Sequence, residues 1–232
     1  MPEPSAEPVL SDQPRLSDAA RIQILATEHW SLLATRGMTW NEMFTRASMF
    51  LTMLSAAVVA LALVAQATDF DDNFRTFALL VLPVVLFLGI GTYIRLGDAR
   101  TEDVWLVIGM NRLRHAYIDL ALDLEQYLVT SHHDDMAGVM LTYGPDSRLT
   151  PSRILAGTPF IVGAVDAVLV GVIVALLAGS IDDRAAMYVS LGVMAAFAAA
   201  ILMLGVIPFR AISRIQREYR PRFPQPDTLP EV

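Results

Sequence analysis

The sequence contains no cysteine, which excludes disulfides, zinc–thiolate sites, iron–sulfur clusters and thiol nucleophiles. All 17 basic residues are arginine, so the sequence contains no lysine either. A Schiff-base lysine and a Walker-type phosphate site are therefore excluded. Charged residues make up only 18% of the chain, and the net charge of −7 argues against a nucleic-acid partner.

Catalytic motifs are missing as well. The sequence has no nucleophile–base pair, no Gly-rich phosphate loop and no paired catalytic carboxylates. We therefore expect no enzyme activity, no catalytic residue and no cofactor.

Histidine-containing segments are expected to be structural. His132–His133–Asp134–Asp135 looks like a metal cluster, but contiguous side chains point in different directions, whereas helical metal pairs lie four residues apart. This stretch is predicted to be a solvated loop without metal. His29 lies in an apolar stripe, where it either senses pH or is buried at a helix contact, and the same holds for His115.

Apolar residues are abundant, at 54% of the chain, and they occur in long blocks. A block of about 20 apolar residues crosses a bilayer, and in hydrocarbon its backbone must form a helix. Four blocks qualify: residues 47–66, 76–94, 154–178 and 186–208. The sequence therefore predicts an all-α fold, a four-helix transmembrane bundle that amphipathic helices extend into the cytoplasm.

Arginine distribution predicts the orientation. All arginines except Arg75 and Arg184 lie before the first block, between the second and third, or after the fourth. The positive-inside rule then places both termini and the middle segment in the cytoplasm of a multi-pass protein of the plasma (inner) membrane.

Composition divides the chain into seven parts. These are a disordered N-terminus (1–16), a cytoplasmic amphipathic helix leading to the first span (17–46), a first transmembrane hairpin (47–95), a cytoplasmic helical insert (96–152), a second transmembrane hairpin (153–209), a basic helix extension (210–220) and a disordered C-terminus (221–232).

Capping signals suggest where helices begin and end. Ser17 is placed to cap a helix over about 18–36 that ends at Gly37. Thr39 and Glu42 form a capping-box pattern for the next helix. Asp72 and Asp182 are expected to cap the second and fourth spanning helices, and Thr150–Pro151 is expected to begin the third.

A heptad seam runs through the helical insert, and a seam of this kind must be buried against another helix. Its partner is the 18–36 helix, the arginine-rich extension of the fourth helix, or the same helix in another subunit. The seam consists of Leu106, Met110, Leu113, Tyr117, Leu120, Leu124 and Tyr127.

Asp166 is the charged residue in the third block, where an aspartate costs about 2.5 to 3.5 kcal/mol. One interpretation is that Asp166 binds a cation or relays a proton. The other is that Asp166 is protonated, or bonded to Ser55, and fixes helix packing. Pro83 is expected to kink the second span, and such a kink is either a gate or only a feature of shape.

Basic residues cluster after the fourth block. They set the topology and are also placed to contact anionic lipid head groups. The cluster consists of Arg210, Arg214, Arg217, Arg220 and Arg222.

Two stretches resemble a group of bacterial four-span membrane proteins to which no activity is attached: RIQILATEHWSLLATRGMTWNEMFTRASMF (residues 21–50) and GMNRLRHAYIDL (109–120). The layout also resembles two-span modules, flanked by cytoplasmic helices, that are thought to form pores. Neither resemblance implies a functional residue.

Two functions are expected. The first is a homo-oligomeric channel or permeation-type protein with Asp166 on its path. The alternative is a non-catalytic membrane scaffold or regulatory subunit that binds a protein partner through its cytoplasmic helices. The expected partners are the lipid bilayer, further copies of the chain and a cytoplasmic protein.

Overall fold

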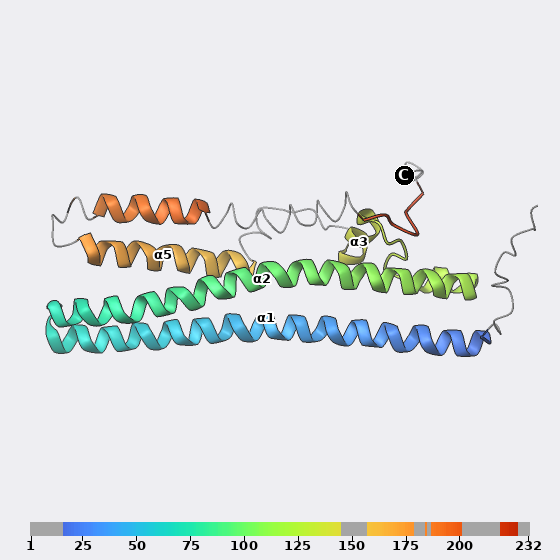
Figure 1. The fold of residues 1–232 in the computed structure, drawn as a ribbon, viewed down its shortest axis with the longest axis horizontal. Coiled ribbons are helices and arrows are strands. Elements are labelled where there is room, and N and C mark those ends of the chain that lie inside the picture. Colours follow the sequence, from blue (N-terminus) through green and yellow to red (C-terminus); the bar gives the residue numbers. More distant parts are fainter. Residues whose placement is uncertain (1–15, 145–156, 179–183, 185–186, 201–218, 227–232) are drawn as a thin grey trace, which may run out of the picture.

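The helices lie side by side in a long, narrow bundle (Figure 1). The computed structural model describes residues 16–144, 157–178, 184, 187–200 and 219–226. Its elements are α1 (Asp18–Thr68), α2 (Asp72–Leu120), the 3-10 helix η1 (Leu122–Tyr127), α3 (Met136–Tyr143), α5 (Thr158–Ala178) and an apolar helix over Met187–Ala200. No strand occurs among these residues, so the all-α prediction is confirmed.

Helix α1 is a single helix of 51 residues. The Ser17 hydroxyl accepts the N–H of Ala20, which confirms the predicted start. The predicted end at Gly37 and the capping box after it are wrong, because the helix continues and the Thr39 hydroxyl donates to the Thr35 carbonyl within it. At 1.5 Å per residue, α1 is about 77 Å long, more than twice the roughly 30 Å of a hydrocarbon core.

A tight turn joins α1 to α2. Asp69 and Phe70 have φ angles of 52° and 62° in the left-handed region, which reverse the chain. The Asp71 carboxylate then accepts the N–H groups of Asn73 and Phe74, so the cap lies one residue before the predicted Asp72. The predicted helix starts at Thr150–Pro151 and Asp182 lie outside the described residues.

Helix α2 spans 49 residues and continues through Pro83, and its ribbon changes direction gradually along its length (Figure 1). Proline inside a helix removes one backbone hydrogen bond without necessarily ending the helix. The role of Pro83 as a gate stays a prediction.

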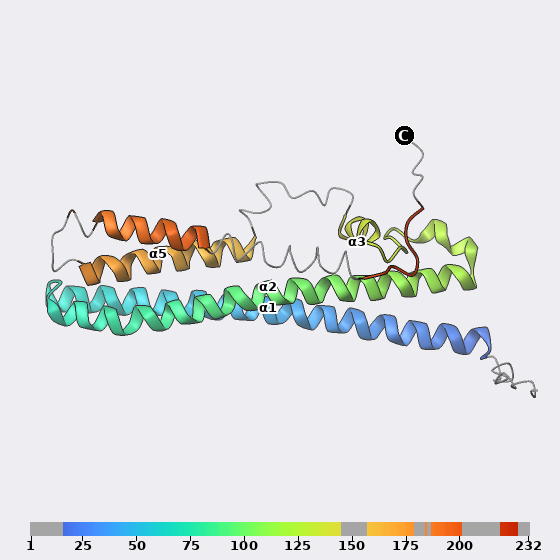
Figure 2. The same ribbon diagram turned by 45° about the horizontal axis from the view of Figure 1, so that its top comes forward.

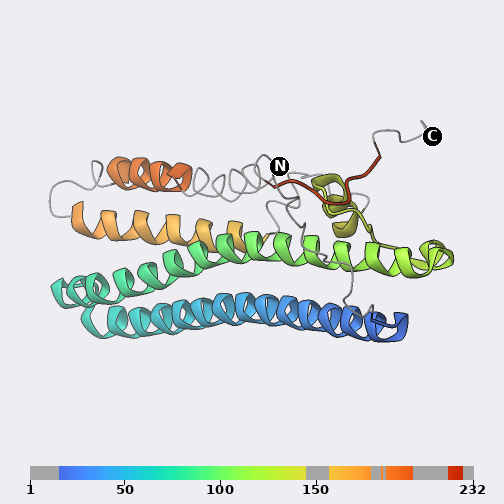
Figure 3. The ribbon, with the colours of Figure 1, turned by 45° about the vertical axis from the view of Figure 1, so that its right-hand side comes forward.

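Among the described residues, three helices, α1, α2 and α5, are long and apolar enough to cross a membrane. Figures 2 and 3 show α5 beside α2, with the Met187–Ala200 helix on its far side. The described part of this last helix is shorter than a span, and residues 201–208 of the fourth predicted block lie outside the described residues. The chain is thus compatible with an integral membrane protein, and the four-helix bundle stays a prediction.

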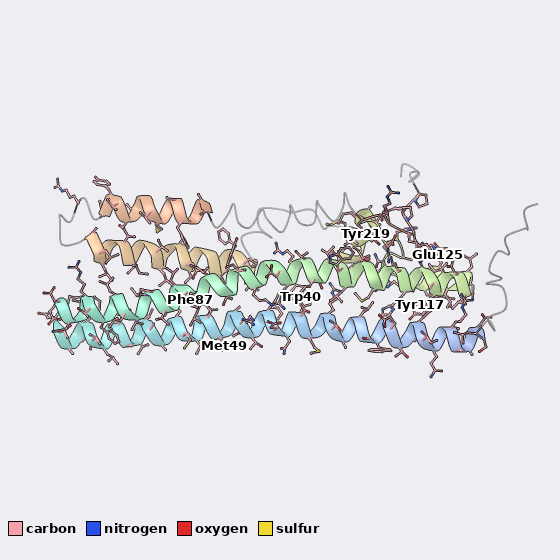
Figure 4. All side chains as sticks on the ribbon, viewed as in Figure 1. Trp40, Met49, Phe87, Tyr117, Glu125 and Tyr219 are labelled. Carbon is pink, nitrogen blue, oxygen red and sulfur yellow. The ribbon has the colours of Figure 1, made fainter. Side chains whose placement is uncertain are left out.

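We call the predicted spans of α1 (residues 47–66) and α2 (residues 76–94), together with α5, the membrane half. Its interior is an apolar cluster that includes Phe50, Leu82 and Val162, one from each helix. Its outer surface is apolar too, since Met49 and Phe87, which are labelled in Figure 4, are 63% and 74% exposed. Such an outer surface is compatible with a lipid environment.

We call the remaining parts of α1 and α2, with η1, α3 and residues 219–226, the polar half. Here Val107, Met110 and Val139 form a second apolar cluster, against which Leu32 of α1 packs. Tyr117 of the heptad seam packs on α1 of the same chain, where its ring stacks on that of His29 with centroids 5.8 Å apart.

The seam is shorter than predicted, because α2 ends at Leu120 and the next residues form the 3-10 helix η1. Leu124 and Tyr127 are therefore exposed rather than part of a continuous helical seam.

Candidate functional site

Asp166 lies in the interior of the membrane half. It is fully buried on α5, and neither carboxylate oxygen has a hydrogen-bond partner among the described residues. A buried polar group without a partner costs on the order of 1–3 kcal/mol, and a charged one costs more. The geometry therefore presents a lone carboxyl group inside the predicted membrane region.

Gly89 makes room for this carboxyl group. A Cβ atom at this position of α2 would overlap both the Asp166 carboxylate and the ring of Phe50 on α1. Gly91, two residues further on the same helix, has nothing within 4 Å of such a Cβ. Gly89 is therefore the point where α1, α2 and α5 approach around Asp166.

One of the two sequence-based alternatives had Asp166 bonded to Ser55, but the structure does not contain this pair. The Ser55 hydroxyl donates to the Leu51 carbonyl of its own helix at 2.8 Å, and the residue is exposed. The prediction of this pair is wrong. It depended on the similar depth of the two residues along the bundle, and depth does not show on which face of its helix a residue lies.

A charged network lies where the membrane half meets the polar half. Arg95 Nη2 lies 2.9 Å from Glu42 Oε2, and Arg95 Nη1 lies 2.6 Å from Glu102 Oε1. Arg46 also bonds Glu42 at 2.8 Å. Hydrogen bonds from Arg95 and Arg46 lower the pKa of Glu42 to about 2. The network links α1 to α2 through their polar side chains.

Asp103 forms a second link, deeper in the polar half. It is 3% exposed and binds Arg36 Nε at 2.6 Å and Trp40 Nε1 at 3.2 Å. The Tyr143 hydroxyl of α3 also donates to it, and burial followed by this hydrogen bond raises the pKa of Tyr143. Asp103 thereby joins α1, α2 and α3.

Asp134 is the anchor of the loop between η1 and α3. It is fully buried and accepts hydrogen bonds from Arg112 Nε and the Tyr219 hydroxyl, both at 2.7 Å, and from the N–H groups of Arg222 and Phe223. Burial alone would raise the pKa of Asp134, but these donors hold it at about 2. The predicted solvated loop is wrong, since its central carboxylate is enclosed by protein.

Residues 219–226 are held against this loop (Figure 3), although disorder was predicted from residue 221. Besides the bonds to Asp134, the Gln225 N–H donates to Asp135 at 3.0 Å. The expectation of disorder is therefore wrong for residues 221–226, and residues 227–232 lie outside the described part of the chain.

Three histidines meet beside this anchor. His115 of α2 and the loop residues His132 and His133 each offer a ring nitrogen, and these atoms lie within 4.8 Å of one another. The sequence did not reveal this group, because His115 is distant along the chain from the His132–His133 pair. The signal that could have revealed the cluster is a helix carrying His115, followed by a chain reversal that returns His132 and His133 beside it.

The basic cluster is described only in part. Arg220 and Arg222 are exposed, and the backbone of Arg222 is bound to Asp134, whereas Arg210, Arg214 and Arg217 lie outside the described residues. Contact of this cluster with lipid head groups stays a prediction.

A comparison of the chain with protein-family models, curated proteins and solved structures finds no match. The resemblance to bacterial four-span proteins stays a prediction. The functional interpretation therefore depends on the geometry of the chain itself.

Proposed function

We propose that the protein is a homo-oligomeric membrane protein of the permeation type, in which Asp166 takes up and releases a proton on the path. The observation that carries this proposal is the fully buried carboxyl group of Asp166, whose two oxygens lack a partner among the described residues. Carboxyl groups at membrane depth are costly, and they typically mark ion or proton pathways.

A proton is the cation that this environment favours. A carboxyl group surrounded by apolar side chains is cheapest in its neutral, protonated form. Metal cations need several oxygen ligands, whereas the groups around Asp166 include Phe50 and Gly89 and no hydrogen-bond partner within the described chain. Transient water between the helices would be enough to pass the proton on, without a permanently open pore.

Self-association is supported by an apolar stripe on α1 in the polar half. Trp30 is 71% exposed, and Leu33, Trp40 and Phe44 on the same face are also exposed. Leu33 lies about 20 Å along the helix before the first predicted span, so lipid does not cover it. A second copy of the chain would remove this stripe from water.

The direct experiment measures proton flux into proteoliposomes loaded with a pH-sensitive dye, driven by a potassium diffusion potential. We expect flux with the wild-type protein, a fall to the background of protein-free liposomes with Asp166→Asn, and no change with Ser55→Ala as the membrane-exposed control. Absence of wild-type flux, or equal flux in Asp166→Asn, would overturn the proposal.

A scaffold or regulatory subunit is the second candidate, because the same stripe could bind a different protein on the proposed cytoplasmic side. Native mass spectrometry in mild detergent separates the two. Oligomers that dissociate in Trp30→Glu support self-association, whereas a monomer that acquires a stoichiometric partner through the stripe supports the scaffold.

A further inference from the structure

The three-histidine cluster combines residues from two separate segments. His115 lies on α2, five residues before the end of the helix, and His132 and His133 lie in the loop that leads to α3. Their rings are close, with centroids 4.1 Å apart for His132–His133, 5.6 Å for His115–His132 and 6.5 Å for His115–His133. All three side chains are partly buried.

Two nitrogens of the cluster lack a partner. Nδ1 of His115 and Nδ1 of His133 are both buried and make no hydrogen bond among the described residues. Buried polar atoms are nearly always satisfied, so two such atoms in one cluster require an explanation. A ligand shared by the imidazoles would satisfy them together.

The surroundings hold the rings in place. The Asn111 amide donates to the His133 carbonyl at 2.8 Å, and the Ser131 hydroxyl accepts the His133 N–H at 3.1 Å. The Phe223 ring stacks on His115 with centroids 3.9 Å apart. Together with the buried Asp134, these contacts fix both the loop and the chain segment that covers it. The cluster is therefore built into the fold and does not depend on exposed side chains alone.

Two carboxylates lie behind the rings. Asp119 Oδ1 is 3.9 Å from His115 Nε2, and Glu125 Oε1 is 3.9 Å from His132 Nε2. Metal-bound histidines commonly direct their second ring nitrogen toward a carboxylate, which fixes the tautomer and strengthens the ligand. Asp119 and Glu125 are placed in this way, although each carboxylate must move closer to its histidine to form a hydrogen bond.

We propose that His115, His132 and His133 bind one divalent transition-metal ion, with Zn²⁺ as the first choice. Three imidazoles without a thiolate suit Zn²⁺, Ni²⁺, Cu²⁺ or Co²⁺, whereas Mg²⁺ and Ca²⁺ require oxygen ligands. Ligand nitrogens in a tetrahedral zinc site lie about 3.3 Å apart, as follows from a Zn–N distance of about 2.0–2.1 Å. Small rotations of the rings would close the present separations, which are at most 4.8 Å.

Three imidazoles fill three positions of a tetrahedron and leave the fourth to water or to a group from a partner. The site is independent of Asp166, so failure of the proton-flux proposal would leave it standing, and the reverse also holds.

The test uses the full-length protein in detergent, with a histidine-free affinity tag, stripped of metal by a chelator. Isothermal titration with ZnCl₂ should give one ion per chain. His132→Asn and His133→Asn should weaken binding by more than the roughly 10–100-fold typical of losing an outer-shell partner, and Asp119→Asn should fall within that range.

His29→Asn is the matched control, because His29 is the one histidine of the four that lies outside the cluster. It should bind Zn²⁺ as the wild type does. Zinc K-edge absorption of the wild-type complex should show three imidazole ligands, which tests the proposal without any variant that could misfold. No stoichiometric binding, fewer imidazoles, or unchanged affinity in both loop variants would overturn it.

Discussion

The same two helices, α1 and α2, are held together by opposite chemistry in the two halves of the molecule. In the membrane half, apolar side chains such as Phe50 and Leu82 meet around a carboxyl group that has no partner within the described chain. In the polar half, the buried carboxylates Asp103 and Asp134 are each bound by several donors. A carboxylate is stabilised where donors surround it, and it signals a functional constraint where they do not.

The largest effect is expected at Asp134, because breaking a buried ion pair costs about 3–5 kcal/mol. Asp134→Ala leaves Arg112 and the N–H groups of Arg222 and Phe223 without their acceptor. We expect a lower thermal midpoint by circular dichroism and faster amide exchange in residues 219–226. Asp123→Ala, at an exposed site in η1, is the control. Equal midpoints for the two variants would mean that Asp134 does not anchor the polar half.

Gly89→Ala should have the next largest effect, and it acts on the membrane half. Its added methyl group overlaps Asp166 and Phe50, and overpacking of this kind typically costs about 1–3 kcal/mol. Gly91→Ala is the matched control, since its methyl group meets nothing within 4 Å. Thermal unfolding in detergent compares the two, and a Gly89→Ala midpoint at or above that of Gly91→Ala would contradict the packing described here.

Acid should loosen the polar half selectively. The pKa of Asp134 is lowered from 3.8 to about 2 in the folded protein, so its contribution is fully present above about pH 4 and is lost as the pH falls toward 2. This lowering of the pKa of Asp134 corresponds to about 2 kcal/mol of folding free energy.

Amide exchange of residues 219–226, corrected for the intrinsic pH dependence, should therefore accelerate below pH 4 in the wild type. Asp134→Ala should lose this pH dependence. Wild-type protection that stays constant down to pH 2 would show that this carboxylate does not hold the segment.

The smallest effect is expected at Gly37, which lies inside α1, where an added methyl group would meet nothing within 4 Å. Glycine in a helix interior costs up to about 1 kcal/mol relative to alanine. Gly37→Ala should therefore raise the thermal midpoint slightly. A lower midpoint would indicate that α1 is divided at this residue, as capping signals alone had suggested.

Sequence patterns predicted the all-α fold and the long apolar helices α1, α2 and α5, because both follow from the composition of single segments, whereas the fourth span stays a prediction. They failed where the outcome depends on packing between segments. Gly37 was interpreted as a helix end, yet the contacts of α1 along α2 maintain the helix through it. The lone Asp166 was identified, but its contact with Gly89 was not.

The loop at His132–Asp135 illustrates the same limit. Adjacent histidines and aspartates looked solvated because their partners, His115 of α2 and residues 219–226, are remote in sequence. A pattern within one segment cannot report which distant segment folds onto it. The heptad seam was predicted too long for a related reason, since the break at Ala121 is set by the chain reversal that follows.

The contrast between the halves is tested most directly by cysteine labelling in native membranes, and the absence of native cysteine removes any background. Met38 and Met49 both lie on α1 and are 74% and 63% exposed, and Met38 lies outside the apolar stripe of Trp30. After permeabilisation, a charged maleimide should label Met38→Cys readily and Met49→Cys hardly at all, because only the first residue faces water. Equal labelling of the two would contradict the assignment of α1 to two solvents.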